Sequence, residues 1–417
     1  MVTAKFVEEL KSQVSKTPVH YCKLSVLDAI LNEGNLRAVN SNFMNDLSEY
    51  KFSSSILQKE LEAVTVSNYI PLTVSFAKIP DQIPQWAMYA KEIGIGIQMD
   101  FTYFIKQQQH QIFKTLIPPS IRQEYISIDK GSDIDYVECG MNYPLNVLYI
   151  KKEERTSLPQ NNYFKTFVDA IKKATKEIDP DMPNKLVAFE DYIPFAATFI
   201  KEQSFEFEKE ARLSTFVLED FGGEYKPNIL FDDKRIYLRP YINLTFVLYG
   251  DDGPEKLGWP IHTIWVGPGR TQYKAFESIV KRLELGTLKV FPVPFKNFLD
   301  RLIAYLYDAL VFVTEPNNKE KKKACKAKAK EIVKGVKATV TDFKLYDSEN
   351  YHICVSKKNY TTSDYIITHA RETLLDVVKE TLLEDKASSK LEEFETKNYF
   401  SIHGIRVRLS EKAYSFV

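Results

Sequence analysis

Residues 204–213, SFEFEKEARL, decide how the central part of this chain is interpreted. In an extended strand, successive side chains point to opposite faces of the sheet. One face of a strand over this stretch would then carry four charged side chains: Glu206, Glu208, Glu210 and Arg212. The alternation of Phe and Glu favours the strand. The alternative is a helix, which would place Glu206 and Glu210 four residues apart on a solvated face.

Three carboxylates in succession on one strand face need a physical explanation. Close carboxylates repel one another and raise each other's pKa, so they require a cation, a ligand or open water. Arg212 occupies the next position on the same face and supplies one cation. Glu206, at the other end of the series, is expected to be solvated.

Length and composition limit the classes of protein to which the chain can belong. Its 417 residues predict roughly two or three domains. The 56 basic and 56 acidic residues cancel, which argues against a global electrostatic grip on nucleic acid or anionic membrane but permits a local patch. No apolar run reaches the ~18 residues that span a bilayer, so we expect no membrane segment. The four cysteines form no C-x-x-C pair, which favours a reducing cytoplasm.

The sequence before residue 296 alternates strand and helix patterns. A short helix is expected over 1–16, and a second over 26–32, capped by Ser25 and ending at Gly34. β-Branched and alternating stretches predict strands over 69–77, 93–99, 205–218, 235–238, 242–248 and 261–266. Residues 101–200 are mostly helical in pattern and are expected to form helical insertions between strands.

The character of the sequence changes after residue 296. Helices are expected over 297–313 and 317–337, followed by a strand pair over 338–355. A long helix should start at the capping box Thr361–Asp364, and a strand should cover 402–409. We therefore expect a main α+β domain over 17–296 and a smaller C-terminal α+β accessory domain over 297–417.

Several polar and aromatic residues have both a structural and a functional interpretation. His20 is either a satisfied core histidine or a ligand-binding group. The NDLSE loop at 45–49 is either an Asx turn or part of a site. Trp86 and Tyr89 either anchor a helix in the core or form a platform for a planar base. The acidic residues lack a metal-ligand spacing, so we expect no metal, and no P-loop or H-E-x-x-H motif occurs.

The lysine-rich segment 319–337 predicts a helix with one apolar stripe and a basic remainder. Such a face is usually only solvated. The alternative is that it binds a partner, either the phosphates of RNA or DNA or an acidic protein surface.

Taken in order, these motifs resemble a widespread bacterial family known only as a domain of unknown function. They are VHYC, a helix that ends at Gly34, NDLSE, VSF, WAMY, EKEAR and VGPG. The resemblance covers roughly residues 17–296. Two positions depart from the family pattern, because Cys22 stands where Thr is usual and Leu47 where Pro is usual. The part of the chain from about residue 297 resembles no family that we can name.

The family pattern is in turn distantly similar to the ADP-ribosyltransferases. This resemblance implies a split, mixed and antiparallel sheet that binds NAD as the substrate. It also implies that Glu210 and Glu208 form the catalytic pair, with Glu210 as the first candidate for the catalytic carboxylate. It implies cofactor-binding roles for His20, Tyr21, Ser75, Trp86, Tyr89 and Arg212. His20 would hold ribose hydroxyls, Tyr89 would stack on nicotinamide, and Trp86 is the second candidate for stacking.

The resemblance implies an NAD-dependent ADP-ribosyltransferase or an NAD glycohydrolase, such as a bacterial toxin or an anti-phage defence effector. Its acceptor would be a protein, a nucleic acid or water. The alternative is a non-catalytic nucleotide-sensing or interaction module of a defence system. A magnesium-dependent nuclease ranks last, because the clustered acids lack a recognisable metal-ligand spacing.

Overall fold

A computed structural model of the chain describes residues 14–43, 47–61, 69–89, 93–102, 144–151, 197–218, 230–232, 239–250, 253–285, 288–290, 295–339, 357–380, 382 and 384–410. The chain divides into two compact units. The first unit consists of Met1–Tyr21, Asn35–Gln85 and Met99–Lys256. The second consists of Cys22–Gly34, Trp86–Gln98 and Leu257–Val417. Both units combine helices with strands, and the strand pairs are parallel as well as antiparallel. The chain is therefore an α+β protein with mixed sheet pairing.

The first unit is organised around β3 (Tyr69–Ala77), which the sequence predicted with these bounds. This strand pairs along its whole length with β8 (Glu210–Leu218) in antiparallel register, from Tyr69 opposite Leu218 to Ala77 opposite Glu210. It also pairs with β2 (Asn35–Asn40) and β1 (Val19–Lys23). Three further strands extend this group of strands: β5 (Leu145–Asn146), β9 (Leu230–Asp232) and β10 (Arg239–Gly250). The strand β11 (Gly253–Leu257) pairs with β10.

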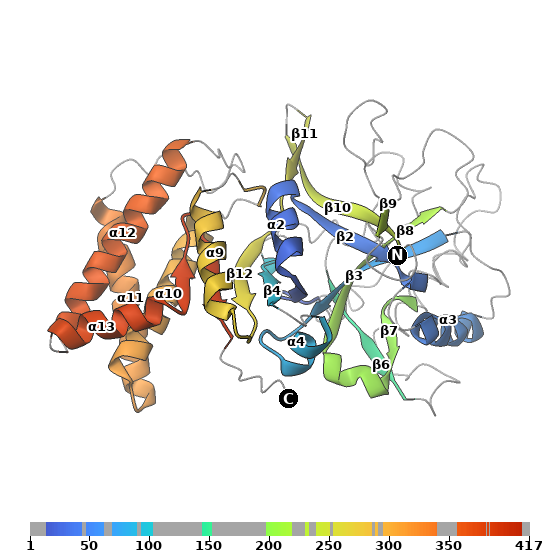
Figure 1. Cartoon of the computed structure of the whole chain (residues 1–417), viewed down its shortest axis with the longest axis horizontal. Coiled ribbons are helices and arrows are strands. Elements are labelled where there is room, and N and C mark those ends of the chain that lie inside the picture. The colour runs from blue at the N-terminus through green and yellow to red at the C-terminus, as the bar shows by residue number, and fades with distance from the viewer. Residues whose placement is uncertain are drawn as a thin grey trace, which may run out of the picture. The chain divides into compact units, whose positions relative to one another are not determined.

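A small parallel pair, β6 (Leu148–Ile150) and β7 (Ile200–Glu202), lies beside this group in the first unit (Figure 1). The helix α3 (Leu47–Leu61) is tied to β7, because the Ser53 hydroxyl donates to the Ile200 carbonyl at 2.6 Å. A 3-10 turn, η1 (Ser41–Phe43), connects β2 to the segment before α3. The helix α3 starts at Leu47, which lies inside the NDLSE stretch that the sequence assigned to a polar loop.

The stretch SFEFEKEARL is only partly a strand. Residues Gln203–Glu208 form a 3-10 helix, η5, and Lys209 follows it in the left-handed conformation with φ of 46°. The Lys209 amide closes the turn onto the Glu206 carbonyl, and the Lys209 carbonyl accepts from the Lys78 amide. The predicted strand over 205–218 therefore starts only at Glu210. The prediction was wrong over 205–209, because the backbone there is satisfied by a turn and not by a strand ladder.

The second unit contains the strand order β4-β12-β14-β13. These strands are β4 (Gly94–Met99), β12 (Ile261–Val266), β13 (Asn398–Phe400) and β14 (Arg406–Leu409). β14 lies parallel to β12, with Thr263 opposite Arg406. The C-terminal strands thus extend a sheet that starts before residue 296. The observed division into units therefore differs from the predicted boundary at 296.

The helices of the second unit include α2 (Leu24–Glu33), α9 (Gln272–Leu285) and four C-terminal helices that share one core. These four are α10 (Phe295–Thr314), α11 (Lys319–Thr339), α12 (Lys357–Lys379) and α13 (Glu384–Glu395), which pack together in Figure 1. Leu302, Ile332 and Leu374 are among the buried residues that hold this core together. The helix α4 (Ile83–Tyr89) starts in the first unit and continues into the second.

Two predicted helix caps were wrong. α2 ends as expected at Gly34, which has φ of 71°, but it starts at Leu24 with Lys23 as its N-cap, so Ser25 lies inside the helix. α12 starts at Lys357, which places the expected capping box at Thr361 inside the helix as well. The expected elements over 1–13, 235–238 and 340–355, and most of 101–200, lie outside the described residues. None of the described helices has the length and apolar character needed to cross a membrane.

Candidate functional site

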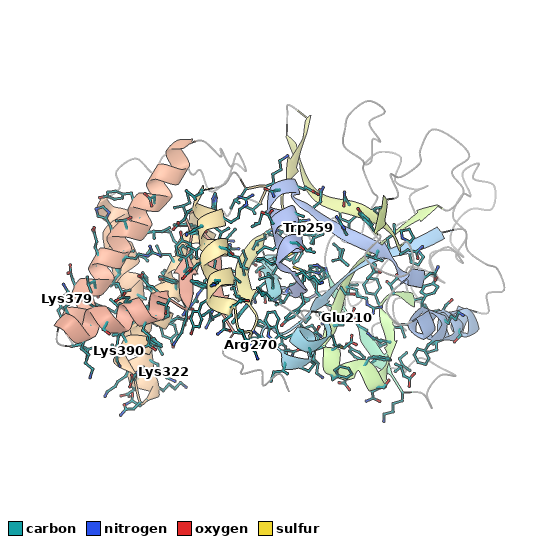
Figure 2. The ribbon with its side chains drawn as sticks, viewed as in Figure 1. Glu210, Trp259, Arg270, Lys322, Lys379 and Lys390 are labelled. Carbon is teal, nitrogen blue, oxygen red and sulfur yellow. The ribbon has the colours of Figure 1, made fainter. Side chains whose placement is uncertain are left out.

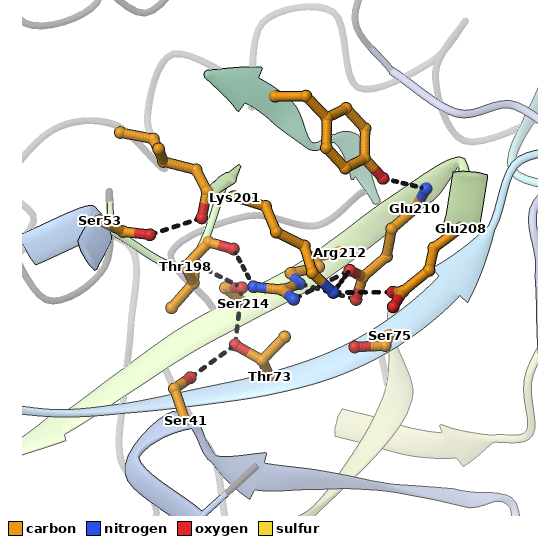
Figure 3. A network of polar contacts seen from close by, with 12 residues as sticks. Ser41, Ser53, Thr73, Ser75, Thr198, Lys201, Glu208, Glu210, Arg212 and Ser214 are labelled. Carbon is orange, nitrogen blue, oxygen red and sulfur yellow. Dashed lines mark hydrogen bonds and ion pairs between the residues drawn. The ribbon is translucent and has the colours of Figure 1, made fainter. Parts of the chain in front are cut away.

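Two buried carboxylates meet one lysine in the first unit. Glu208 ends η5 and Glu210 starts β8, and the left-handed Lys209 between them lets both side chains turn to the same place (Figure 3). Lys201 lies in β7, and its Nζ is 2.7 Å from Glu208 Oε2 and 3.2 Å from Glu210 Oε2. Only 6% of Glu208 and 5% of Glu210 is exposed. A single ammonium group therefore bridges two carboxylates out of contact with bulk water.

Arg212 completes this group by binding Glu210 through two nitrogens. Its Nε donates to Glu210 Oε1 at 2.8 Å and its Nη2 to Oε2 at 2.9 Å. Its Nη1 donates to the Thr198 carbonyl at 2.7 Å. Such a two-point contact fixes the plane of the carboxylate as well as its charge. We call Lys201, Glu208, Glu210 and Arg212 the carboxylate cluster.

The electrostatics of the carboxylate cluster keep Glu210 ionised. Burial opposes the charged form and by itself would raise the pKa of the carboxyl. The positive charges of Arg212 and Lys201, together with the hydrogen bonds from Arg212, outweigh burial and lower the pKa of Glu210 to about 2. With two positive and two negative groups, the cluster is formally neutral, which is how a protein interior tolerates buried charge.

A chain of hydroxyl groups connects four segments beside the carboxylate cluster (Figure 3). Thr198 Oγ1 donates to Ser214 Oγ at 2.8 Å, and Ser214 Oγ is 3.0 Å from Thr73 Oγ1. Thr73 Oγ1 is in turn 3.1 Å from Ser41 Oγ. This chain ties η1, β3, β8 and the turn that precedes β7 together. It therefore sets the position of the strands that carry Glu210 and Arg212.

The backbone around the two carboxylates is also fixed by side chains. The Glu210 amide donates to the Tyr149 hydroxyl oxygen at 2.8 Å, and burial raises the pKa of that phenol. The Gln85 side-chain amide donates to the Glu208 carbonyl at 2.8 Å. The site is therefore held by the main chain as well as by ion pairs.

Ser75 places a hydroxyl group beside Glu210. It lies opposite Arg212 in the β3–β8 register and contributes to the low pKa of Glu210. Its oxygen is buried and interacts with the Glu210 carboxylate, although it makes no hydrogen bond of normal geometry with the described residues. A buried hydroxyl group whose hydrogen bond is poorly formed gains from a ligand or water that satisfies it better. Ser75 is therefore the position beside the carboxylate cluster that is best suited to bind a ligand hydroxyl.

His20 is not brought to the carboxylate cluster. Val19 lies opposite Ala77, and Ala77 lies opposite Glu210, so Val19 and Glu210 share one face of the sheet. His20 is the next residue and points to the other face. Its ring makes an edge contact with Phe76 at 5.8 Å, and its Nδ1 donates to the Ser75 carbonyl at 3.0 Å. Burial lowers the pKa of the imidazole.

The aromatic residues that the sequence proposed as ligand-binding groups make other contacts where the structure describes them. Only 2% of Trp86 is exposed, and its ring packs so closely on Gly267 that a Cβ there would lie 2.8 Å away. The ring is buried in the core, and the stacking role of Trp86 stays a prediction. The Tyr21 hydroxyl accepts from the Gln82 amide at 3.2 Å, and burial raises the pKa of Tyr21 to about 12. The side chain of Tyr89, and Asn45 and Asp46 of the NDLSE loop, lie outside the described part of the chain.

Sequence reasoning missed Lys201, although it provides the bridge between the two carboxylates. A signal was present, since Lys201 follows the apolar run Ala196–Ala197–Thr198–Phe199–Ile200 and a lysine next to such a run needs a counter-charge. Its aliphatic stem and ammonium group also lie against the Phe205 ring, with Nζ 4.8 Å from the ring centre.

Comparison with known proteins found no matching family model, no matching curated protein and no matching solved structure. Within the described residues, no three His, Cys, Asp or Glu side chains are grouped in a way that would hold a metal ion.

Proposed function

We propose that the carboxylate cluster is the active site of an enzyme that breaks the bond between nicotinamide and ribose in NAD. The enzyme would transfer the ADP-ribose to an acceptor or release it to water. The observation that carries this proposal is Glu210, a buried carboxylate that Arg212 and Lys201 keep ionised and that lies beside the Ser75 hydroxyl group. The sequence resemblance to ADP-ribosyltransferases, including their split sheet, supplies the choice of NAD.

The chemistry requires a fixed negative charge. When the C1′–N bond breaks, its electron pair leaves with neutral nicotinamide, and positive charge develops on the ribose. A carboxylate that is already in place stabilises this charge without reorganisation. The Ser75 hydroxyl would bind a ribose hydroxyl, which positions the sugar against Glu210. Glu208 would take the proton of the water or acceptor group that attacks C1′.

The residues around this site differ from those that the resemblance implied. His20 lies on the opposite face of the sheet, so it is not part of the proposed site, and Trp86 is buried in the core. Stacking of the nicotinamide ring by Tyr89 or Trp86 stays a prediction.

A specific observation favours the alternative, a non-catalytic nucleotide-sensing module. Arg212 and Lys201 already engage both oxygens of Glu210. A carboxylate that is so fully satisfied can serve as a structural centre that holds β7 and β8 together. The same fold would then bind a nucleotide without cleaving it.

One pair of measurements separates the two functions. The purified full chain is incubated with NAD, nicotinamide release is followed by chromatography, and NAD binding is measured by calorimetry. For the enzyme, we expect release by the wild type and a loss of roughly 100-fold or more in Glu210→Gln, as for removal of one charge-stabilising group. Glu206→Gln is the matched control, because Glu206 pairs with Lys209 at the surface. Binding without release supports the sensing module, and the absence of both refutes both functions.

A further inference from the structure

The helix α11 has two faces of opposite character. Its apolar face is used inside the second unit, where Ala329, Ile332, Val333 and Val336 are buried in the core shared with α10 and α12. The remainder of the helix carries lysines that do not contribute to this core. The apolar face therefore fixes which side of the helix meets solvent.

Five lysines form one line along the solvent side of α11. They recur every three or four residues, which places them on a single stripe: Lys319, Lys323, Lys326, Lys330 and Lys334. All five are exposed. At 1.5 Å per residue, the stripe is roughly 22 Å long, with a positive charge about every 5 to 6 Å. We call these five residues the lysine stripe.

No ion pair neutralises the lysine stripe within the described part of the chain. The salt bridge that α11 does contain joins Lys328 to Glu331, away from the stripe. Like charges at this spacing repel one another, so a purely structural helix gains nothing from them. The stripe therefore creates a local positive potential on a chain whose total charge is zero.

Two basic side chains of α13 lie near the turn that precedes α11. Lys390 binds the Val313 carbonyl at the end of α10 and Glu315 in the turn that precedes α11. Lys386 lies close enough to Glu315 to help lower the pKa of that carboxyl. Figure 2 shows Lys322 and Lys390 at the same end of the helical group. Glu315 thus neutralises Lys390 and leaves the lysine stripe as the positive surface.

We propose that the lysine stripe binds the phosphate backbone of double-stranded nucleic acid without reading its sequence. A regular row of phosphates is the polyanion whose geometry matches an extended row of lysines, each of which acts as a point charge. α11 contains no aromatic residue and no arginine, so it lacks the groups that stack on unpaired bases or bind a base edge at two points. A membrane is a poorer partner, because the apolar face that would insert is buried in the core.

The test measures binding of the full chain to a labelled duplex of about 20 base pairs by fluorescence anisotropy at several salt concentrations. Five phosphate contacts predict that log K falls with log salt with a slope of about −4.5. The double variant Lys326→Gln/Lys330→Gln should reduce the slope to about −2.7, since each lost contact removes about 0.9. Gln and Lys have similar helix propensities, so the helix should be retained, and circular dichroism checks this.

The matched control is Lys321→Gln/Lys328→Gln, which removes the same charge from the opposite side of the same helix. This control should change the slope by less than half as much. The proposal is overturned if the wild type does not bind the duplex at 50 mM salt, or if both double variants weaken binding equally. It is also overturned if vesicles with phosphatidylserine or a poly-glutamate chain bind as tightly as the duplex, which would indicate a membrane or an acidic protein as the partner. None of these outcomes depends on NAD.

Discussion

Replacing Glu210 by Gln removes the charge at the centre of the carboxylate cluster and keeps the shape of the side chain. Arg212 and Lys201 then lose a carboxylate that offsets their buried charges, while the ion pair between Lys201 and Glu208 remains. Because an unpaired buried charge is costly, we expect Glu210→Gln to destabilise the first unit. The cost must depend on pH, since the wild-type side chain can also lose its charge by taking up a proton.

The size of the effect follows from the pKa of Glu210. A folded-state pKa of about 2, against 4.5 for the free side chain, corresponds to about 3 kcal/mol of stability, at about 1.4 kcal/mol per tenfold change in proton affinity. The pKa is lowered on folding, so this stability is fully present above pH 4.5 and is lost as the pH falls through 2. At pH 3, about half or less of it should remain.

The assay is urea unfolding at pH 7, 5, 4 and 3, with hydrogen exchange in peptides that cover β3 and β8 as the readout. Wild type and Glu210→Gln should differ by about 3 kcal/mol at pH 7 and should converge toward pH 3. Glu206→Gln, which changes an exposed carboxylate four residues away, should match the wild type at each pH. Equal stability of Glu210→Gln and wild type at pH 7, or a difference that is the same at every pH, would show that Glu210 is not held ionised by its neighbours.

Two further substitutions test the packing and the charges. Lys201→Met leaves Glu208 and Glu210 facing each other and should lower the free energy of unfolding by about 3 to 5 kcal/mol at neutral pH. The loss should be smaller at pH 5, where one of the two carboxylates can take up a proton. Urea unfolding at both pH values measures the loss, and a loss that does not depend on pH contradicts the prediction. Gly267→Ala drives a methyl group into the Trp86 ring and should cost about 1 to 3 kcal/mol by tryptophan fluorescence, whereas Gly335→Ala, which meets nothing within 4 Å, should be neutral or stabilising.

Much of the second unit was predictable from local pattern. The predicted helix over 297–313 corresponds to α10 and the predicted strand over 261–266 to β12, because both sequences have a clear apolar period. The first residues of the helices were harder to predict, as α2 and α12 show. A capping motif competes with neighbouring residues that can also adopt helical geometry, and tertiary packing decides between them.

The carboxylate cluster was predicted in part, but on a wrong geometry. Strand alternation placed Glu208, Glu210 and Arg212 on one face, and these side chains do meet. They meet because Lys209 adopts a left-handed conformation, which no residue pattern in this stretch specifies. The same turn leaves Glu206 in solvent with Lys209. Lys201 was missed because its approach to Glu208 depends on how β7 lies relative to η5, which is a tertiary property.

The position of His20 shows most clearly what a single sequence does not contain. Its membership of the site depends on strand register, because moving β1 by one residue along β3 would turn His20 toward Glu210 and Val19 away from it. Both residues suit their present faces, since Val19 is fully buried and His20 packs on Phe76. A sequence pattern that tolerates either face cannot select one register. The proposed site is therefore defined by β3 and β8, whose pairing runs over nine residues and leaves no such freedom.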